Sequence, residues 1–285
     1  MQLALSCVPP TFNIAATSAA YAQMAGLLSG FAFTALVMLL KPTRSRRRRP
    51  EDQLPVALFA AFVALLLSTL TYSLLAGEDV VGARARTATE ELVDGLPFGL
   101  AFIMLLHGLT FLLDSGGAGR ALVRAVHVIT VLVLPALTML YLVNAVPDME
   151  SARAQLAGGC PSTSMYTFGL ILTALTIAVL GAMLVARSRW PRFRDWTPRR
   201  PDAAPFLVLV VCIASAVCAG FLASRSPNFL FPSAGLATFL ELAWLLLTGI
   251  GTVLIASWPP PKAPDPPTGR IGRHRSRTRA ASTAN

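Results

Sequence analysis

The chain alternates between long apolar runs and short segments rich in arginine. Because an α-helix rises about 1.5 Å per residue, roughly twenty apolar residues cross the hydrocarbon core of a bilayer. Seven runs of about this length occur, and we expect them near Tyr21–Leu40, Leu54–Ala76, Val93–Leu113, Ala121–Val146, Tyr166–Ala186, Pro205–Ser224 and Leu236–Ser257. The predicted fold class is therefore all-α, a polytopic integral membrane bundle of seven transmembrane helices.

The composition is wrong for a soluble globular protein. Of 285 residues, 54% are hydrophobic and only 13% are charged, which is too little charge to cover a water-exposed surface. The net charge of +10 would suggest a nucleic-acid partner if the basic residues formed one continuous patch. They occur instead in clusters between apolar runs, so we expect no nucleic acid and predict contacts between the arginines and anionic lipid headgroups.

The basic residues also predict an orientation. The segments 41–53, 114–124, 187–204 and 258–285 hold 20 of the 24 lysines and arginines, whereas the alternate loops hold four. Basic residues close to a transmembrane helix resist translocation. We therefore expect the N-terminus outside and the C-terminus in the cytoplasm of a bacterial-type plasma (inner) membrane.

The two terminal segments differ from the apolar core of the chain. Residues 1–20 have neither a basic start nor a long apolar run, so we interpret them as an extracytoplasmic leader and not as a cleaved signal peptide. Residues 258–285 are rich in proline and arginine and have little to bury, which predicts a disordered cytoplasmic tail. The seven-helix membrane domain then spans residues 21–257.

Glu241 is the main candidate for a functional group, since ionisable side chains inside a membrane segment are costly and face protein or water. It lies about five residues into the last apolar run. At helical spacing it shares a stripe with Thr238, Thr248 and Thr252, and we expect this stripe to face the bundle interior.

Further polar residues fall at the same side of the membrane as Glu241. They are Tyr72, Asp94, Tyr141 and Asn144. We expect an outward-facing polar pocket in which Tyr72, Tyr141, Asn144 and Thr238 bind a substrate beside Glu241 and Asp94. The alternative is that the tyrosines and Asp94 are ordinary residues of the membrane–water interface.

Two histidines raise the alternative of a haem- or metal-binding protein. His107 and His127 lie about six residues from the cytoplasmic ends of consecutive antiparallel runs, so they should share one depth. Imidazoles on adjacent helices can ligate haem iron or, with Asp114, a divalent metal. Each histidine can equally form a hydrogen bond with a neighbouring helix, so we expect no cofactor in the leading interpretation.

The four cysteines form two groups once the orientation is assigned. Cys212 and Cys218 lie in one apolar run and, six residues apart, point to different helix faces. Cys7 and Cys160 are both expected outside, where oxidising conditions permit a disulfide between them.

No motif assigns an enzymatic activity, since the sequence lacks GxxxxGK[S/T], HExxH, GxSxG and CxxC. Two functional classes therefore remain. The first is a small-molecule sensor or transporter that uses the pocket around Glu241. The second is an intramembrane enzyme for a lipid or isoprenoid, a hydrophobic small molecule. Glu241 or Asp94 would be its general acid, kept protonated by an apolar cavity for cyclase-type chemistry.

Overall fold

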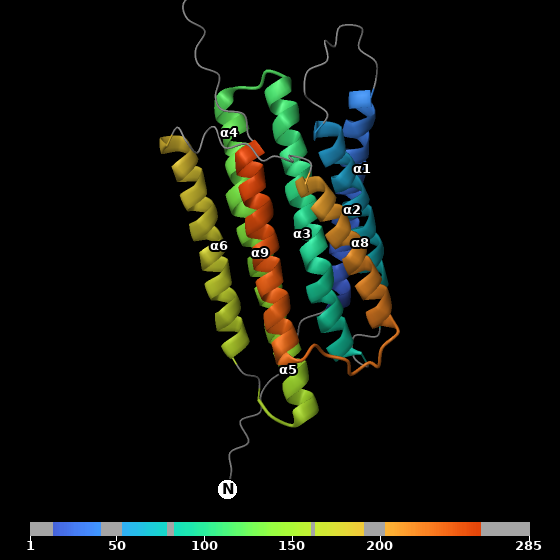
Figure 1. Cartoon of the computed structure of the whole chain (residues 1–285). Coiled ribbons are helices and arrows are strands. Elements are labelled where there is room, and N and C mark those ends of the chain that lie inside the picture. Colours follow the sequence, from blue (N-terminus) through green and yellow to red (C-terminus); the bar gives the residue numbers. More distant parts are fainter. Residues whose placement is uncertain (1–13, 41–52, 79–82, 161–162, 191–202, 258–285) are drawn as a thin grey trace, which may run out of the picture.

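The structure is a computed structural model and describes residues 14–40, 53–78, 83–160, 163–190 and 203–257 (Figure 1). All regular secondary structure within these ranges is helical. The elements are α1 (Ile14–Leu40), α2 (Gln53–Ala76), α3 (Arg84–Ser115), α4 (Arg120–Val128), η1 (Ile129–Val133), α5 (Leu134–Ala157), α6 (Ser164–Arg189), α8 (Ala203–Ala223) and α9 (Ser233–Ser257).

These elements make seven helices that are long and apolar enough to cross a membrane, because α4, η1 and α5 form one continuous helix, Arg120–Ala157. The chain is thus a multi-pass membrane protein with an all-helical fold, as the apolar runs predict. Two helices begin earlier than expected, α1 at Ile14 and α3 at Arg84. The segments 1–13 and 258–285, which include most of the expected leader and the whole expected tail, lie outside the described residues.

The bundle has two ends, which we call lower and upper after Figure 1. Helices α1, α3, α6 and α9 begin at the lower end, and α2, α5 and α8 end there. The arginine-rich loops 41–52 and 191–202 follow the upper ends of α1 and α6, so the upper end corresponds to the expected cytoplasmic side.

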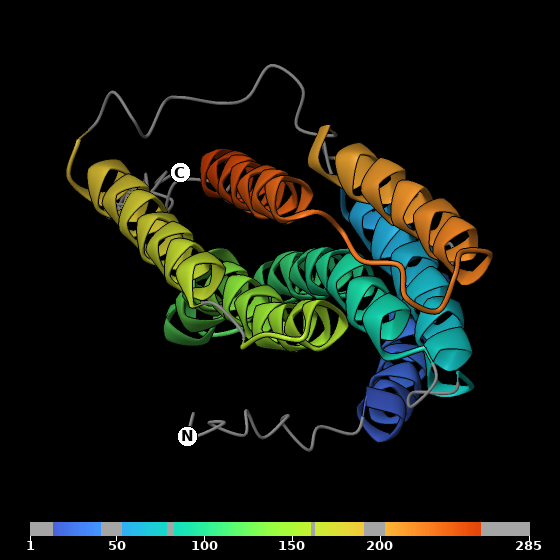
Figure 2. The same ribbon diagram turned by 90° about the horizontal axis from the view of Figure 1, so that it is seen from below.

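Helix α3 is the central element of the bundle. It packs against α2, α5 and α8, while α6 and α9 complete the opposite side against α5 (Figure 2). Almost every residue in the first half of α3 is buried, including polar residues such as Thr87, Thr89 and Glu90. The polar side chains on this half of α3 are therefore enclosed by protein and shielded from lipid and water.

Helix α1 packs along α2 through a face of small residues. Its buried positions, spaced three or four residues apart, are Ile14, Ser18, Ala22, Ala25, Ser29 and Ala32. Small residues at this spacing let helix backbones approach closely in a membrane. The approach brings Tyr21 of α1 against Tyr72 of α2, with ring centroids 5.4 Å apart.

A π-helical segment interrupts the long helix Arg120–Ala157. It covers Ile129–Val133 and ends just before Pro135. Proline has no backbone N–H and cannot donate to the carbonyl four residues earlier, and a wider helical turn is a usual way to accommodate that loss. The interruption lies in the upper half of this helix, between His127 and Tyr141.

Candidate ligand site at the lower end of the bundle

Three carboxylates of α3 are buried at the lower end of the bundle. Glu90 and Glu91 are each 4% exposed and Asp94 is 1% exposed. The three residues lie within about one and a half helical turns. Buried carboxylates require hydrogen bonds, counter-charges or protons. Burying three of them together is therefore costly unless such partners are present.

Two tyrosines link this cluster to the neighbouring helices. The Tyr141 hydroxyl of α5 donates a hydrogen bond to Oε1 of Glu91 at 3.3 Å. The hydroxyls of Tyr141 and Tyr72 lie 3.4 Å apart, and either can donate. Thr71, beside Tyr72 on α2, is the hydrogen-bonding neighbour of Asp94. Side chains of α2, α3 and α5 therefore converge on one polar centre.

Aromatic rings cover the side of this centre that faces α1. The Tyr21 ring lies 5.3 Å from the Tyr141 ring and 5.7 Å from the Phe98 ring, centroid to centroid. The Tyr72 and Phe98 rings are 6.0 Å apart in an edge-to-face arrangement. We call the carboxylates and tyrosines together the acid–tyrosine cluster, which comprises Tyr21, Tyr72, Glu90, Glu91, Asp94 and Tyr141.

Gly95 permits the contact between α3 and Tyr141. A Cβ atom at Gly95 would lie only 2.5 Å from Cε1 of the Tyr141 ring. Gly99, one turn further along α3, faces Thr138 in the same way, with a Cβ-to-Cγ2 separation of 2.2 Å. Neither contact tolerates a side chain, so the two glycines set the close packing of α3 on α5.

Arg86 is the counter-charge for only part of the acidic cluster. Its guanidinium pairs with Glu78 at 2.6 Å and approaches Glu90 at 3.7 Å. No ion pair joins Glu91 or Asp94 to a basic side chain within the described ranges. Oε2 of Glu91 and Oδ1 of Asp94 are buried and accept no hydrogen bond there. Glu91 and Asp94 thus have more acceptor oxygens than the described side chains around them have hydrogen-bond donors.

The connection between α8 and α9 closes the lower end of α3. Arg86 donates to the carbonyl oxygens of Ala223 at 3.4 Å and Arg225 at 2.9 Å. Its backbone N–H donates to the carbonyl of Pro227 at 3.2 Å. Arg153 of α5, which pairs with Glu150, donates to the carbonyl of Phe231 at 2.5 Å. Two arginines therefore hold residues 223–231 over the polar centre.

A surface recess lies on the other side of Tyr21. It has a volume of about 520 Å³ and is lined by Ala16, Thr17, Ala20, Tyr21 and Met24. Tyr21 lines the recess and also contacts the rings of Tyr72 and Tyr141. Tyr21 thus belongs both to the lining of the recess and to the acid–tyrosine cluster.

Three of the residues expected in an outward-facing pocket come together here. Tyr72, Asp94 and Tyr141 all belong to the acid–tyrosine cluster. Asn144 does not join them, because it lies on the exposed face of α5. Its neighbours in the same turn of α5, Leu142, Val143 and Ala145, are the residues that face the core.

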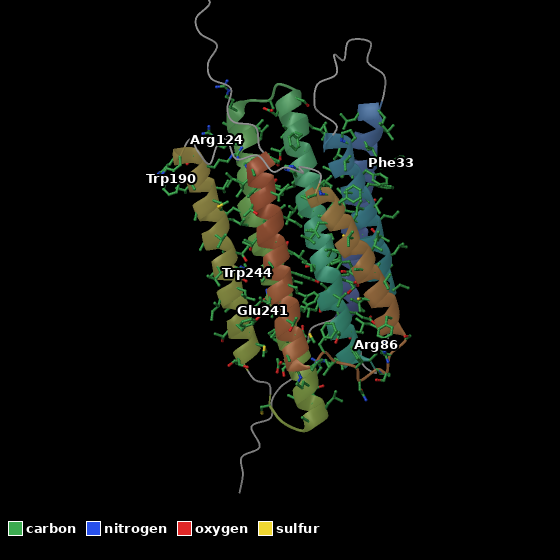
Figure 3. All side chains as sticks on the ribbon, in the orientation of Figure 1. Phe33, Arg86, Arg124, Trp190, Glu241 and Trp244 are labelled. Carbon is green, nitrogen blue, oxygen red and sulfur yellow. The ribbon has the colours of Figure 1, made fainter. Side chains whose placement is uncertain are left out.

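The expectation that Glu241 faces the bundle interior is wrong. Glu241 and Thr238 lie on an exposed face of α9. Figure 3 shows Glu241 apart from Arg86. The buried face of α9 is the apolar stripe Leu236, Leu240, Ala243, Leu247 and Ile250. Helix α9 packs against α6, and large apolar side chains such as Leu242 and Leu245 remain on its exposed face. Glu241 and Thr238 therefore do not face the acid–tyrosine cluster.

Sequence reasoning missed Glu90, Glu91 and Tyr21 as members of the site. The third apolar run begins at Val93, so the two glutamates fell into an expected loop. Residues 84–92 contain neither glycine nor proline, and they include good helix formers such as alanine, arginine and glutamate. That local composition was the available signal for a longer α3.

His107 and His127 are both buried at the upper end of the bundle, on α3 and α4. They lie within electrostatic range of each other, and Arg187 of α6 is a positive neighbour of His127. No group of three histidine, cysteine or acidic side chains converges there in the part of the chain that the structure describes, and Asp114 is exposed. A guanidinium beside the pair disfavours a divalent cation.

The cysteines divide as expected where they are described. Cys160 is disulfide-bonded, whereas Cys212 and Cys218 are free. Cys7, the expected partner of Cys160, lies outside the described residues. Cys160 follows α5 directly, so its disulfide belongs to the lower end of the bundle.

Comparison with known proteins gives no relative: no family model, no curated protein and no solved structure matches the chain. The acid–tyrosine cluster is therefore interpreted from its own chemistry.

Proposed function

We propose that this protein is a plasma-membrane sensor or transporter module that binds a small cationic ligand at the acid–tyrosine cluster. One observation carries the proposal: Glu91 and Asp94 are buried without an ion pair among the described residues, and each keeps an oxygen that accepts no hydrogen bond. A bound cation would supply the missing charge and, if it is an amine, the missing donors.

The surrounding rings suit the same class of ligand. A cation over the face of an aromatic ring is attracted by the ring quadrupole, by about 2 kcal/mol when both are desolvated. The Tyr21 ring lies 5.4 Å from the Tyr72 ring and 5.3 Å from the Tyr141 ring, centroid to centroid. Aromatic rings combined with carboxylates favour protonated amines and quaternary ammonium groups over anions and sugars.

The arrangement of Tyr21 supports entry from the side of α1. The recess of about 520 Å³ ends at Tyr21, and the acid–tyrosine cluster begins behind it. Rotation of the Tyr21 side chain would connect the recess with the acid–tyrosine cluster. Residues 223–231, by contrast, are tied down by Arg86 and Arg153.

The orientation expected from the arginines would place this site outside the cell. The disulfide of Cys160 supports the same assignment independently, since it belongs to the end opposite the arginine-rich loops. Disulfides persist in oxidising compartments and are rare in the cytosol.

The interior of α3 favours a sensor over a transporter. Between Asp94 and His107, about 20 Å along the helix axis, the buried side chains of α3 that face its neighbours are apolar. They are Leu96, Leu100, Ile103 and Met104. No ionisable residue of α3 lies between Asp94 and His107, so a ligand bound at the lower end would act through helix movement and would not cross the bundle.

The enzymatic alternative has less support. Asp94, one candidate general acid, is 1% exposed beneath packed helices. Glu241, the other, lies on a separate exposed face of α9. The two carboxylates cannot serve one intramembrane cavity.

Ligand binding by the purified protein in lipid nanodiscs tests the proposal. We would titrate methylammonium, tetramethylammonium and sodium, with acetate and glucose as anionic and neutral probes. Removing one partner of a buried charge pair costs about 2–5 kcal/mol, so Asp94→Asn and Glu91→Gln should weaken cation binding about thirtyfold or more. Glu241→Gln is the matched control and should bind normally.

Either of two results would contradict the proposal. One is selective binding of acetate or glucose. The other is cation binding that Asp94→Asn and Glu91→Gln leave unchanged. Flux of the bound cation across proteoliposomes would identify a transporter, whereas binding without flux supports a sensor.

A further inference from the structure

Glu241 is a carboxylate on an exposed face inside a membrane-spanning helix. Helix α9 has 25 residues, or about 38 Å, whereas the hydrocarbon core is about 30 Å thick. The Glu241 backbone lies about 12 Å from the start of α9. If α9 is centred in the bilayer, Glu241 is about 8 Å inside the hydrocarbon region.

The protein itself gives this carboxylate no partner. Glu241 makes no ion pair or hydrogen bond with any residue in the described ranges. Lipid chains offer no donor, and an acidic side chain inside the hydrocarbon region is costly unless a partner covers it. A second protein surface that covers the face would remove this cost.

The rest of the exposed face suits close contact with another helix. It carries Thr238, Leu242, Leu245 and Gly249 at helical spacing around Glu241. A Cβ atom placed at Gly249 would meet nothing within 4 Å, so the position is open. Small residues let helices approach closely, and polar side chains then form hydrogen bonds between them.

We infer that this face binds the α9 helix of a second copy of the chain, in a parallel two-fold homodimer. All copies insert in one orientation, so two α9 helices run parallel and present Glu241 at the same depth. A pair of carboxyl groups is self-complementary, because one that holds a proton donates to an oxygen of the other. A two-fold axis beside α9 brings the two groups together.

The positions of the basic residues indicate that Glu241 meets the carboxyl group of the second copy and does not form a salt bridge with one of its arginines. The exposed arginines in the described part of the chain lie at helix ends or in a loop, namely Arg120, Arg124, Arg189 and Arg225. None lies at the depth of Glu241 on an exposed helix face. A second copy therefore offers Glu241 a carboxyl group, not a guanidinium.

Dimerisation measured by single-molecule photobleaching in lipid vesicles tests the inference. Glu241→Leu should weaken dimerisation about tenfold, since a hydrogen bond between membrane helices is worth about 1–2 kcal/mol. Glu241→Gln keeps a donor and an acceptor and should retain the dimer. Gly249→Leu should weaken dimerisation by blocking close approach, whereas Gly220→Leu is the matched control on α8, another open glycine.

Crosslinking locates the interface independently of stability. A cysteine at Leu245 should crosslink two copies, whereas the native exposed thiol of Cys218 on α8 should not. The inference is wrong if the protein is monomeric at all densities or if a dimer survives both Glu241→Leu and Gly249→Leu. Crosslinking through Cys218 in place of residue 245 would also overturn it.

Discussion

The Tyr141 hydroxyl donates a hydrogen bond to Oε1 of Glu91 at 3.3 Å, which joins α5 to the lower part of α3. The same hydroxyl lies 3.4 Å from that of Tyr72 on α2. Three helices are therefore connected through one oxygen atom. The lower half of the bundle depends on this contact for both its packing and its polar chemistry.

Replacement of Tyr141 by phenylalanine should destabilise the protein by about 1–3 kcal/mol. The substitution keeps the ring but leaves a buried acceptor on Glu91 without its donor, and such a loss costs about this much. Thermal unfolding in detergent measures the effect. Tyr166→Phe on α6 is the control, because Tyr166 is partly exposed and lies outside the acid–tyrosine cluster. Equal stability of the two variants would contradict the assigned role of Tyr141.

Gly95→Ala should separate α3 from α5 and lower the unfolding temperature. The added methyl group would lie 2.5 Å from the Tyr141 ring, and overpacking of this kind typically costs about 1–3 kcal/mol. Gly220→Ala on α8, where nothing lies within 4 Å, should be nearly neutral. A neutral Gly95→Ala variant would mean that Tyr141 does not pack across α3.

Arg86→Met should release the connection between α8 and α9. The change removes the donor to the carbonyls of Ala223 and Arg225 and leaves Glu90 buried without its counter-charge. Breaking a buried ion pair costs about 3–5 kcal/mol, and the half-buried Arg86 should approach the lower figure. Amide hydrogen exchange in residues 223–231 should become faster. Arg225→Gln, which removes only an exposed side chain over the Phe221 ring, should leave that exchange slow.

Thiol labelling should distinguish the cysteines by redox state. After denaturation without a reductant, a maleimide should modify Cys212 and Cys218, which are free. The peptide that contains Cys160 should be modified only after reduction, because Cys160 is disulfide-bonded. Modification of Cys160 before reduction would show that the native protein lacks this bond.

Reporter fusions should place the two ends of the bundle on opposite sides of the membrane. Alkaline phosphatase, which is active only outside the cytoplasm, should be inactive when fused after Asn285 and active when fused after Gly159. The expectation follows from the arginines near the upper end and the disulfide at the lower end. The reverse pattern would place the acid–tyrosine cluster on the cytoplasmic side.

Much of the fold could be predicted from the sequence, because a bilayer imposes a minimum apolar length on every spanning helix. All seven helices appear as apolar runs, and most boundaries agree within a few residues. Hydropathy measures which residues sit in lipid, however, and not where a helix begins. The polar first turns of α3, which include Glu90 and Glu91, therefore lie outside the helix that the apolar run predicts.

The site was harder to predict because membrane helices are apolar on more than one face. The stripe of Thr238 and Glu241 and the stripe of Leu236 and Leu240 are both regular. Which of them faces the bundle depends on how α9 fits α6, and a periodic pattern contains no information about that fit. Tyr72, Asp94 and Tyr141 were identifiable because each is polar at the end of an apolar run.

The order of the helices along the chain has a consequence for biosynthesis. Helix α3 leaves the ribosome with Glu90, Glu91 and Asp94 before Tyr141 and residues 223–231 have been made. During that interval the carboxylates of a half-inserted chain lack the α5 hydroxyl and the loop that later enclose them. The nascent protein must therefore keep the start of α3 near water or the insertion machinery until the last two helices arrive, and only complete chains can bury it.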